Sequence, residues 1–233
     1  MNSFIRGAVT PLLSFWRLSC LLLVGGVLVG CSSQKQGLPP FTASGYVDEN
    51  GAVRIWRKDG ENGTVHLLSV FSPWHNNGNT VINDYRWQGD KLVSMVLKTE
   101  GSAPQTTTVR FDANGALSFM QREVNGMKQQ LSNEQIALEQ YNATRIRKTS
   151  DALRTGKVIL HQGHWNQNES ITTCEGNVSR PEFDSFFLSY IQDRQRRSAK
   201  PVSVAWLSAP EGTQLLLVAN SDFCSWQPKA DTF

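Results

Sequence analysis

The sequence has little excess charge of either sign. It contains 23 lysine and arginine residues against 20 aspartate and glutamate residues, and Arg6 and Arg17 both lie within its first 30 residues. Outside that segment, 21 basic residues therefore face 20 acidic ones. Proteins that bind nucleic acids hold the phosphates with a clear excess of basic residues, so nucleic acid is not expected as a partner.

Motifs of the common enzyme classes are missing as well. The sequence contains no G-x-S-x-G nucleophile turn, no glycine-rich phosphate loop, no dinucleotide fingerprint and no zinc-ligand spacing. Its acidic residues are scattered, and no pair stands out as a general acid and base. We therefore expect a binding protein or adaptor that has neither enzymatic activity nor a cofactor.

Long apolar runs are also scarce, and the one that occurs lies near the N-terminus. Residues 18–30 read LSCLLLVGGVLVG, preceded by Arg6 and Arg17 and by no acidic residue. A helix of that length rises about 20 Å, which is short of the roughly 30 Å hydrocarbon core of a bilayer. The pattern predicts a signal peptide over residues 1–30 rather than a transmembrane helix.

The end of this apolar run carries a second signal. Leu28-Val29-Gly30-Cys31 resembles the lipobox of bacterial lipoproteins, in which the cysteine is lipidated and becomes the first residue of the mature chain. Ser32 follows, and in this class a residue other than aspartate there favours the outer membrane. We expect anchoring by lipid on Cys31 to the periplasmic face of the outer membrane, with residues 31–40 as a polar tether.

Cysteine is otherwise rare. Of the four cysteines, Cys20 lies in the signal peptide and Cys31 takes the lipid, which leaves Cys174 and Cys224. In an oxidising compartment we expect these two to form a disulfide. Closing a loop of about 50 residues would stabilise the fold by about 3–4 kcal/mol. Their spacing differs from the C-x-x-C of redox-active pairs, which favours a structural role.

Residues 41–131 repeat one pattern, a short β-prone run followed by a turn rich in Gly, Asn and Asp. Residues 92–97, for example, follow the turn Gln88-Gly89-Asp90-Lys91, and Asn125-Gly126 is a strong signal for a two-residue hairpin. Strand runs separated by such turns predict an antiparallel meander. Because no motif recurs at a fixed period, a propeller or a solenoid is excluded.

A connecting helix is expected over residues 132–156. Ser132-Asn133-Glu134-Gln135 has the form of a capping box, and Leu131 and Ile136 stand where a hydrophobic staple belongs. Gly156 is a typical C-terminal stop. The apolar stripe predicted for this helix consists of Ile136, Ala137, Leu138 and Tyr141.

Residues 157–233 are expected to form a small barrel-like unit, with strands at 158–161, 170–174, 202–207 and 214–218. A second capping-box pattern begins at Ser179, and the apolar residues after it have the spacing of one helix face, which predicts a buried helix. These residues are Phe183, Phe186, Phe187, Tyr190 and Ile191. With one further strand, the order matches a five-stranded barrel of the OB type. The expected fold class is α+β, mostly β.

Two short segments are candidates for ligand or metal binding. His161 and His164 are spaced for a metal pair only if Gly163 ends the strand, because residues three apart on a strand point to opposite faces. Trp74 and His75 stand in a stretch with loop composition, where an exposed tryptophan suits a ligand site. For each segment the alternative is an ordinary packing or surface role.

The chain as a whole resembles the YjaH-type lipoproteins of enteric bacteria, an uncharacterised family. The resemblance covers essentially the full chain and rests on the N-terminal MNSFIRGAVTPLLSFW, the lipobox at Cys31 and the segment LLLVANSDFCSWQP that begins at Leu215. It implies no catalytic residue. Together these features predict a lipoprotein that faces the periplasm and binds an envelope protein or another envelope component. The alternatives are a ligand- or metal-binding lipoprotein and, with the least support, an enzyme that acts on envelope components.

Overall fold

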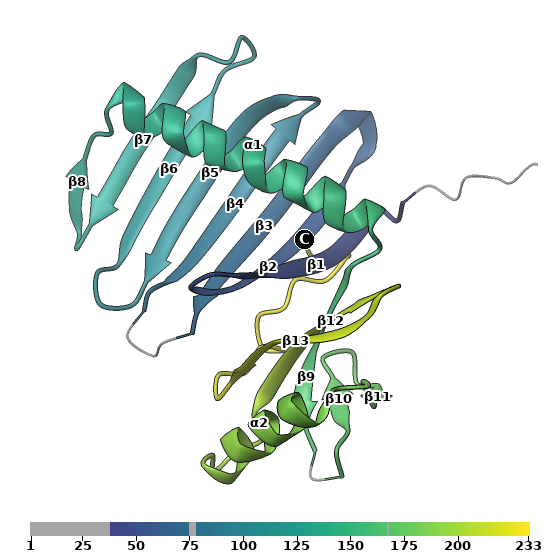
Figure 1. Cartoon of the computed structure of the whole chain (residues 1–233). Helices are drawn as coiled ribbons and strands as arrows, with labels where there is room; N and C mark the ends of the chain where they lie inside the picture. Colours follow the sequence, from purple (N-terminus) through teal and green to yellow (C-terminus); the bar gives the residue numbers. More distant parts are fainter. Residues whose placement is uncertain (1–37, 75–77, 167) are drawn as a thin grey trace, which may run out of the picture. The chain divides into compact units, whose positions relative to one another are not determined.

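The computed structural model describes residues 38–74, 78–166 and 168–233. The first eight strands form one antiparallel sheet in which each strand pairs with the next along the chain (Figure 1). They are β1 (Phe41–Asp48), β2 (Gly51–Asp59), β3 (Thr64–Pro73), β4 (Thr80–Gln88), β5 (Lys91–Glu100), β6 (Gln105–Phe111), β7 (Leu117–Val124) and β8 (Met127–Gln129), with the 3-10 turn η1 (Glu61–Gly63) before β3. The predicted meander is thereby confirmed. The predicted signal peptide, Cys31 and most of the predicted tether lie outside the described residues.

The hairpin between β7 and β8 shows how the turn residues set the register. Asn125 and Gly126 are the only residues between the two strands, and both have left-handed backbone angles, with φ of 50° and 79°. Such a two-residue turn matches the twist of the flanking strands, so Val124 pairs directly with Met127. Asparagine and glycine adopt this conformation at little cost.

Helix α1 (Asn133–Thr155) begins where the capping box predicts. The backbone N–H of Gln135 donates to Ser132 Oγ at 3.3 Å, and Gln135 Oε1 accepts from the backbone N–H of Ser132 at 2.9 Å. These two bonds satisfy donors that the first helical turn leaves without partners. Gly156 caps the C-terminus as expected, while Lys157 takes the left-handed conformation, with a φ of 54°.

Helix α1 lies across one face of the eight-stranded sheet (Figure 1). Its buried residues are Ile136, Ala143, Ser150 and Arg154. The predicted stripe is therefore wrong in part, because Leu138 and Tyr141 are 57% and 65% exposed. The buried residues recur at helical spacing along the side of α1 that faces the sheet, and two of them, Ser150 and Arg154, are polar. A stripe chosen by hydrophobicity alone therefore falls on the wrong side of the helix.

The remaining strands form a second antiparallel sheet in the order β11-β10-β9-β12-β13. They are β9 (Ile159–Trp165), β10 (Ile171–Thr173), β11 (Val178–Ser179), β12 (Ser203–Ala209) and β13 (Gly212–Ala219). Five strands and one helix match the expected content, but the sheet is open, so the expected barrel closure is wrong. Strands β10 and β11 have only three and two residues, too few to curl round and pair with β13.

Helix α2 (Ser185–Arg196) begins later than the sequence predicts. Ser179 pairs with Ile171 of β10 and stays extended, so it cannot cap a helix. Asp184 is the N-cap instead, and its Oδ1 accepts from the backbone N–H of Phe187 at 2.8 Å. The helix is also less buried than expected, since Ile191 is its one buried residue among those described.

Strand β2 is buried on both faces. Val53 and Ile55 contact the hydrophobic cluster beneath α1, whereas Ala52 and Trp56 belong to a second cluster that includes residues of β9, β12 and β13. Because side chains alternate along a strand, the small sheet packs on the face of β2 that points away from α1.

Candidate functional site

A cleft of about 970 Å³ lies between α2, β13 and the strands β2 to β4. Its volume falls within the range of small-ligand sites in proteins. One wall is helix α2, represented by Phe186 and Tyr190, and the opposite wall comes from β3 and β4, represented by Val70 and Ile82. Strand β13 contributes its residues 215–219.

Four of the aromatic side chains on the walls of this cleft are unusually exposed. The exposed fraction is 42% for Trp74, 72% for Phe186, 45% for Tyr190 and 41% for Trp226. Scattered exposed aromatics are ordinary, but several that converge on one concavity mark a surface that a partner or ligand covers. The cleft thus has the character of a binding site for an apolar group.

Arg54 of β2 lines the same cleft and is only 2% exposed. Its Nη1 donates to Gln162 Oε1 at 2.8 Å, and its Nη2 donates to Ser72 Oγ at 3.1 Å. The guanidinium lies over the rings of Phe223 and Trp226, at 4.4 and 4.9 Å from their centroids. Its Nε is buried without a hydrogen-bond partner among the described residues.

No acidic side chain of the described residues pairs with Arg54. Burial therefore acts on its charge without compensation and lowers the pKa of Arg54 to about 9. The group is still a cation at neutral pH, and a buried cation without a counterion is costly. An anionic ligand group in the cleft would remove that cost.

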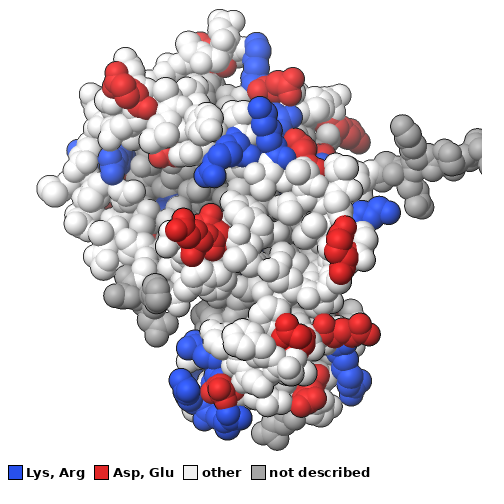
Figure 2. Space-filling model, in the orientation of Figure 1, with Lys and Arg blue, Asp and Glu red and all other residues white. Residues whose placement is uncertain are grey.

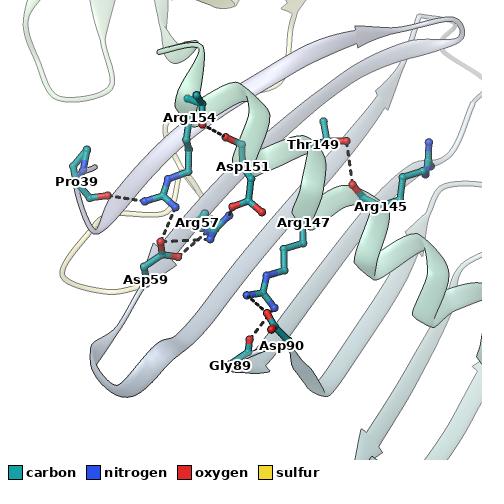
Figure 3. Close-up of polar contacts among 11 residues, drawn as sticks. Pro39, Arg57, Asp59, Gly89, Asp90, Arg145, Arg147, Thr149, Asp151 and Arg154 are labelled. Carbon is teal, nitrogen blue, oxygen red and sulfur yellow. Dashed lines mark hydrogen bonds and ion pairs between the residues drawn. The ribbon is translucent and has the colours of Figure 1, made fainter. Parts of the chain in front are cut away.

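The other buried arginines among the described residues are paired, as Figure 3 shows. Arg57 donates to Asp59 Oδ1 at 2.7 Å and to Asp151 Oδ1 at 2.5 Å, and Arg154 donates to Asp59 Oδ2 at 2.6 Å. Arg154 also donates to the carbonyl oxygen of Pro39 at 3.1 Å. Burial lowers the pKa of Arg57, but the bonds to both carboxylates outweigh it and raise the pKa overall.

Positive charge gathers at the C-terminal end of α2, beside the cleft. Figure 2 shows lysine and arginine side chains gathered where α2 lies in Figure 1. Arg194 and Arg196 lie in the last turn of that helix, where cations favour the helix dipole, and Arg194 lines the cleft. With Glu100 as the acidic residue on the lining, the charged groups of the cleft are two arginines against one glutamate.

Of the site residues predicted from sequence, Trp74 lies at the cleft. It follows β3 directly and lines the wall. His75 lies outside the described residues. The structure therefore brings one member of the predicted Trp74–His75 site to the cleft.

The predicted pair His161 and His164 does not converge. Both residues lie in β9, which continues through Gly163 to Trp165, so the two side chains point to opposite faces of the sheet. His161 stacks on Trp206 with ring centroids 5.1 Å apart. A metal site built on both histidines is therefore wrong.

The predicted disulfide joins Cys174 to Cys224, with the two Cα atoms 5.0 Å apart. His164 Nε2 lies 2.9 Å from Asp222 Oδ1, and the sulfur of Cys224 is also close to this pair. Because that sulfur is bound in the disulfide, it is not a thiolate and cannot complete a metal site with them. The disulfide fixes the chain next to Phe223, which stacks on Arg54.

Arg54 is the residue that sequence reasoning missed. A single arginine between Val53 and Ile55 in a strand buried on both faces was the available signal. The exposure of Phe186 and Tyr190 carried no such signal, since their spacing is the same as that of a buried helix face.

The comparisons with known proteins agree with the resemblance noted in the sequence. The model of a family described as protein of unknown function (DUF1481) matches residues 43–229. The chain is 57% identical to the uncharacterized protein YjaH of Escherichia coli strain K12, over 100% of both chains. No solved structure matches the chain. In the part of the chain that the structure describes, no helix is long and apolar enough to cross a membrane.

Proposed function

This chain belongs to the family of proteins of unknown function DUF1481, and we propose that it is a non-enzymatic binding lipoprotein of the bacterial cell envelope. In this proposal, lipid on Cys31 holds the protein at the periplasmic face of the outer membrane. The cleft between α2 and the strands β2 to β4 is the binding site. The observation that carries the proposal is the convergence of exposed aromatic rings on one cleft that also contains the unpaired charge of Arg54.

The lining of the cleft favours binding over catalysis. Its charged groups are Arg54, Arg194 and Glu100, and the rest of the lining is largely aromatic and aliphatic. An apolar cleft with a few polar groups is typical of sites that orient a ligand, whereas general acid–base chemistry needs a positioned pair of titratable groups. The partner we expect is an envelope protein or another envelope component that offers an apolar surface and a negative group.

The anchor is tested by mass spectrometry of the mature protein isolated from cells. The wild type should begin at Cys31 and carry the mass of the added acyl chains. Cys31→Ser should lack that mass, and Cys20→Ser is the matched control because Cys20 lies within the predicted signal peptide. A wild-type protein that retains residues 1–30 or lacks the acyl mass would remove the anchor from the proposal.

The cleft is tested by photo-cross-linking in living cells. A photoreactive phenylalanine analogue replaces Phe186 on the cleft wall in one strain and Tyr141 in another. Tyr141 is a suitable control, since it is a similarly exposed aromatic residue, on α1. We expect one recurrent adduct of defined mass from position 186 and only diffuse background from position 141. Equal adducts from the two positions would contradict the assignment of the cleft.

A further inference from the structure

The free edge of β13 faces the cleft. Residues 215–219 are consecutive, and all five line it. The register with β12 shifts at Leu216, but side chains alternate between the two faces from Leu217 to Ala219, so a cavity beside one face would not touch all three of these residues. A cavity that touches every residue in a row approaches the strand from its edge, where the backbone N–H and C=O groups point outward.

Strand β13 has no pairing partner on that side among the described residues. Its partner on the other side is β12, and no further backbone hydrogen bond reaches residues 215–219. The outward groups of Leu215 to Ala219 are therefore available for a ladder of hydrogen bonds along the cleft.

Four strands form sheet edges among the described residues, namely β1, β8, β11 and β13, and two of them are protected in ways that β13 is not. Strand β8 has three residues, one of them Lys128, and β11 has only two. Short edges and edge lysines prevent pairing with foreign chains. By contrast, β13 has eight residues, and its segment at the cleft reads LLLVA, without charge or proline. An edge of this kind is the surface that an extended peptide joins in strand addition.

Arg54 marks one end of this edge. Phe223 follows shortly after β13 and lies over the guanidinium at 4.4 Å, and Ala219, Ser221 and Phe223 all line the cleft. A chain that extends along β13 therefore reaches a buried cation without a counterion. The group that complements a guanidinium best is a carboxylate, which a polypeptide supplies at its C-terminus or on an acidic side chain.

We propose that the cleft receives an extended segment of another polypeptide, which pairs with the free edge of β13 and places a carboxylate at Arg54. This inference rests on the proposed function and specifies its partner class. Main-chain hydrogen bonds would supply affinity, and the aromatic wall of α2 would select apolar side chains. The carboxylate would fix the register of the segment along β13.

Hydrogen–deuterium exchange distinguishes strand addition from simple filling of the cleft. The probe is a synthetic pool of short peptides that alternate apolar residues with serine or threonine, offered to the full-length lipoprotein in lipid nanodiscs. We expect slower exchange in the amides of residues 213–220 when peptide is present. Oleate, an anionic ligand without amides, fills an apolar cleft but cannot pair with β13 and should leave these amides unprotected.

The carboxylate is tested with three versions of the same peptide pool. One has a free C-terminus, one has an amidated C-terminus, and one has an amidated C-terminus plus an acidic residue near the end. Loss of a charged hydrogen bond should weaken binding by about tenfold to a hundredfold, so the amidated pool without an acid should bind worst. The better of the two acidic pools identifies the source of the carboxylate.

Variants of Arg54 complete the test. Arg54→Gln should bind all three pools equally weakly, while Arg54→Lys should keep part of the preference for acid. The disulfide and an unchanged exchange pattern of α1 serve as controls for folding. Binding of oleate without any protection by peptides would overturn strand addition and leave the cleft as a ligand site. If neither binds and cross-linking from position 186 equals that from position 141, the proposed function fails as well.

Discussion

Two arginines on one strand separate a structural side of the molecule from the proposed binding side. Arg54 and Arg57 both lie in β2, both are almost fully buried, and their odd spacing sends them to opposite faces. Arg57 lies beneath α1 and is paired with two carboxylates. Arg54 lies at the cleft, bonded to uncharged side chains and covered by aromatic rings. The difference teaches that burial alone does not distinguish Arg54 from a structural arginine, whereas its missing counterion does.

The largest loss of stability is expected when the disulfide on the cleft side is removed. Replacing Cys174 and Cys224 together with alanine removes the link that closes a loop of 50 residues. On the chain-entropy model this should lower the free energy of unfolding by about 3–4 kcal/mol. Urea titration of the mature protein measures the change, and the wild type with its disulfide intact, titrated without reductant, is the control. A loss within experimental error would show that the segment around Phe223 is held by packing alone.

A comparable loss is expected on the structural side from Asp59→Asn. Asp59 accepts from both Arg57 and Arg154, so its neutralisation leaves Arg57 with Asp151 as its one carboxylate partner and Arg154 with none among the described residues. Breaking a buried ion pair on one side costs about 3 kcal/mol. The matched control is Asp90→Asn, because Asp90 is fully exposed in its ion pair with Arg147. Equal midpoints for Asp59→Asn and Asp90→Asn in urea would refute the structural role of this network.

The sharpest version of the comparison replaces each arginine of β2 with methionine. Arg57→Met should destabilise the protein by about 2–3 kcal/mol, because carboxylates remain that were paired with a cation. Arg54→Met removes a buried charge that has no counterion, so its stability should stay within about 1 kcal/mol of wild type. Thermal unfolding of the two variants side by side measures the difference. Equal losses would mean that Arg54 is as structural as Arg57.

The smallest effect concerns pH. Burial lowers the pKa of His161 from its usual 6.5, and the negative charge of Glu175 opposes this only in part. A depressed histidine pKa means that the folded state favours the neutral ring. The associated stability is therefore complete above about pH 6.5 and is lost as the pH falls below it. His161→Gln should flatten the decline of the melting temperature between neutral and mildly acidic pH. A decline as steep as in wild type would assign the pH dependence to other groups.

Local sequence patterns predicted those parts of the fold that depend on local bonds. The turn at Asn125-Gly126, the cap at Ser132 and the pairing of Cys174 with Cys224 were all foreseeable. The late start of α2 was not, because Ser179 is held extended by a strand that is itself positioned through long-range pairing.

The cleft could not be predicted from local patterns, for a similar reason. The partner of Arg54 in β9, Gln162, lies 108 residues away, and nothing near Arg54 in the sequence shows that no carboxylate reaches it. The exposure of Phe186 likewise depends on the cleft that it lines with β13 and the larger sheet, and these elements are distant from Phe186 in the sequence. Trp74, singled out from the sequence for the loop composition around it, does line the cleft, and that composition is a local signal.

The central claim is that the unpaired charge of Arg54 marks the binding side of the molecule. The most direct test is photo-cross-linking from position 186 in cells that carry either Arg54 or Arg54→Met, with position 141 as the baseline. The account predicts that the adduct from position 186 falls to that baseline in Arg54→Met, while the amount of folded, disulfide-bonded protein is unchanged. An adduct that persists undiminished in Arg54→Met would contradict the claim.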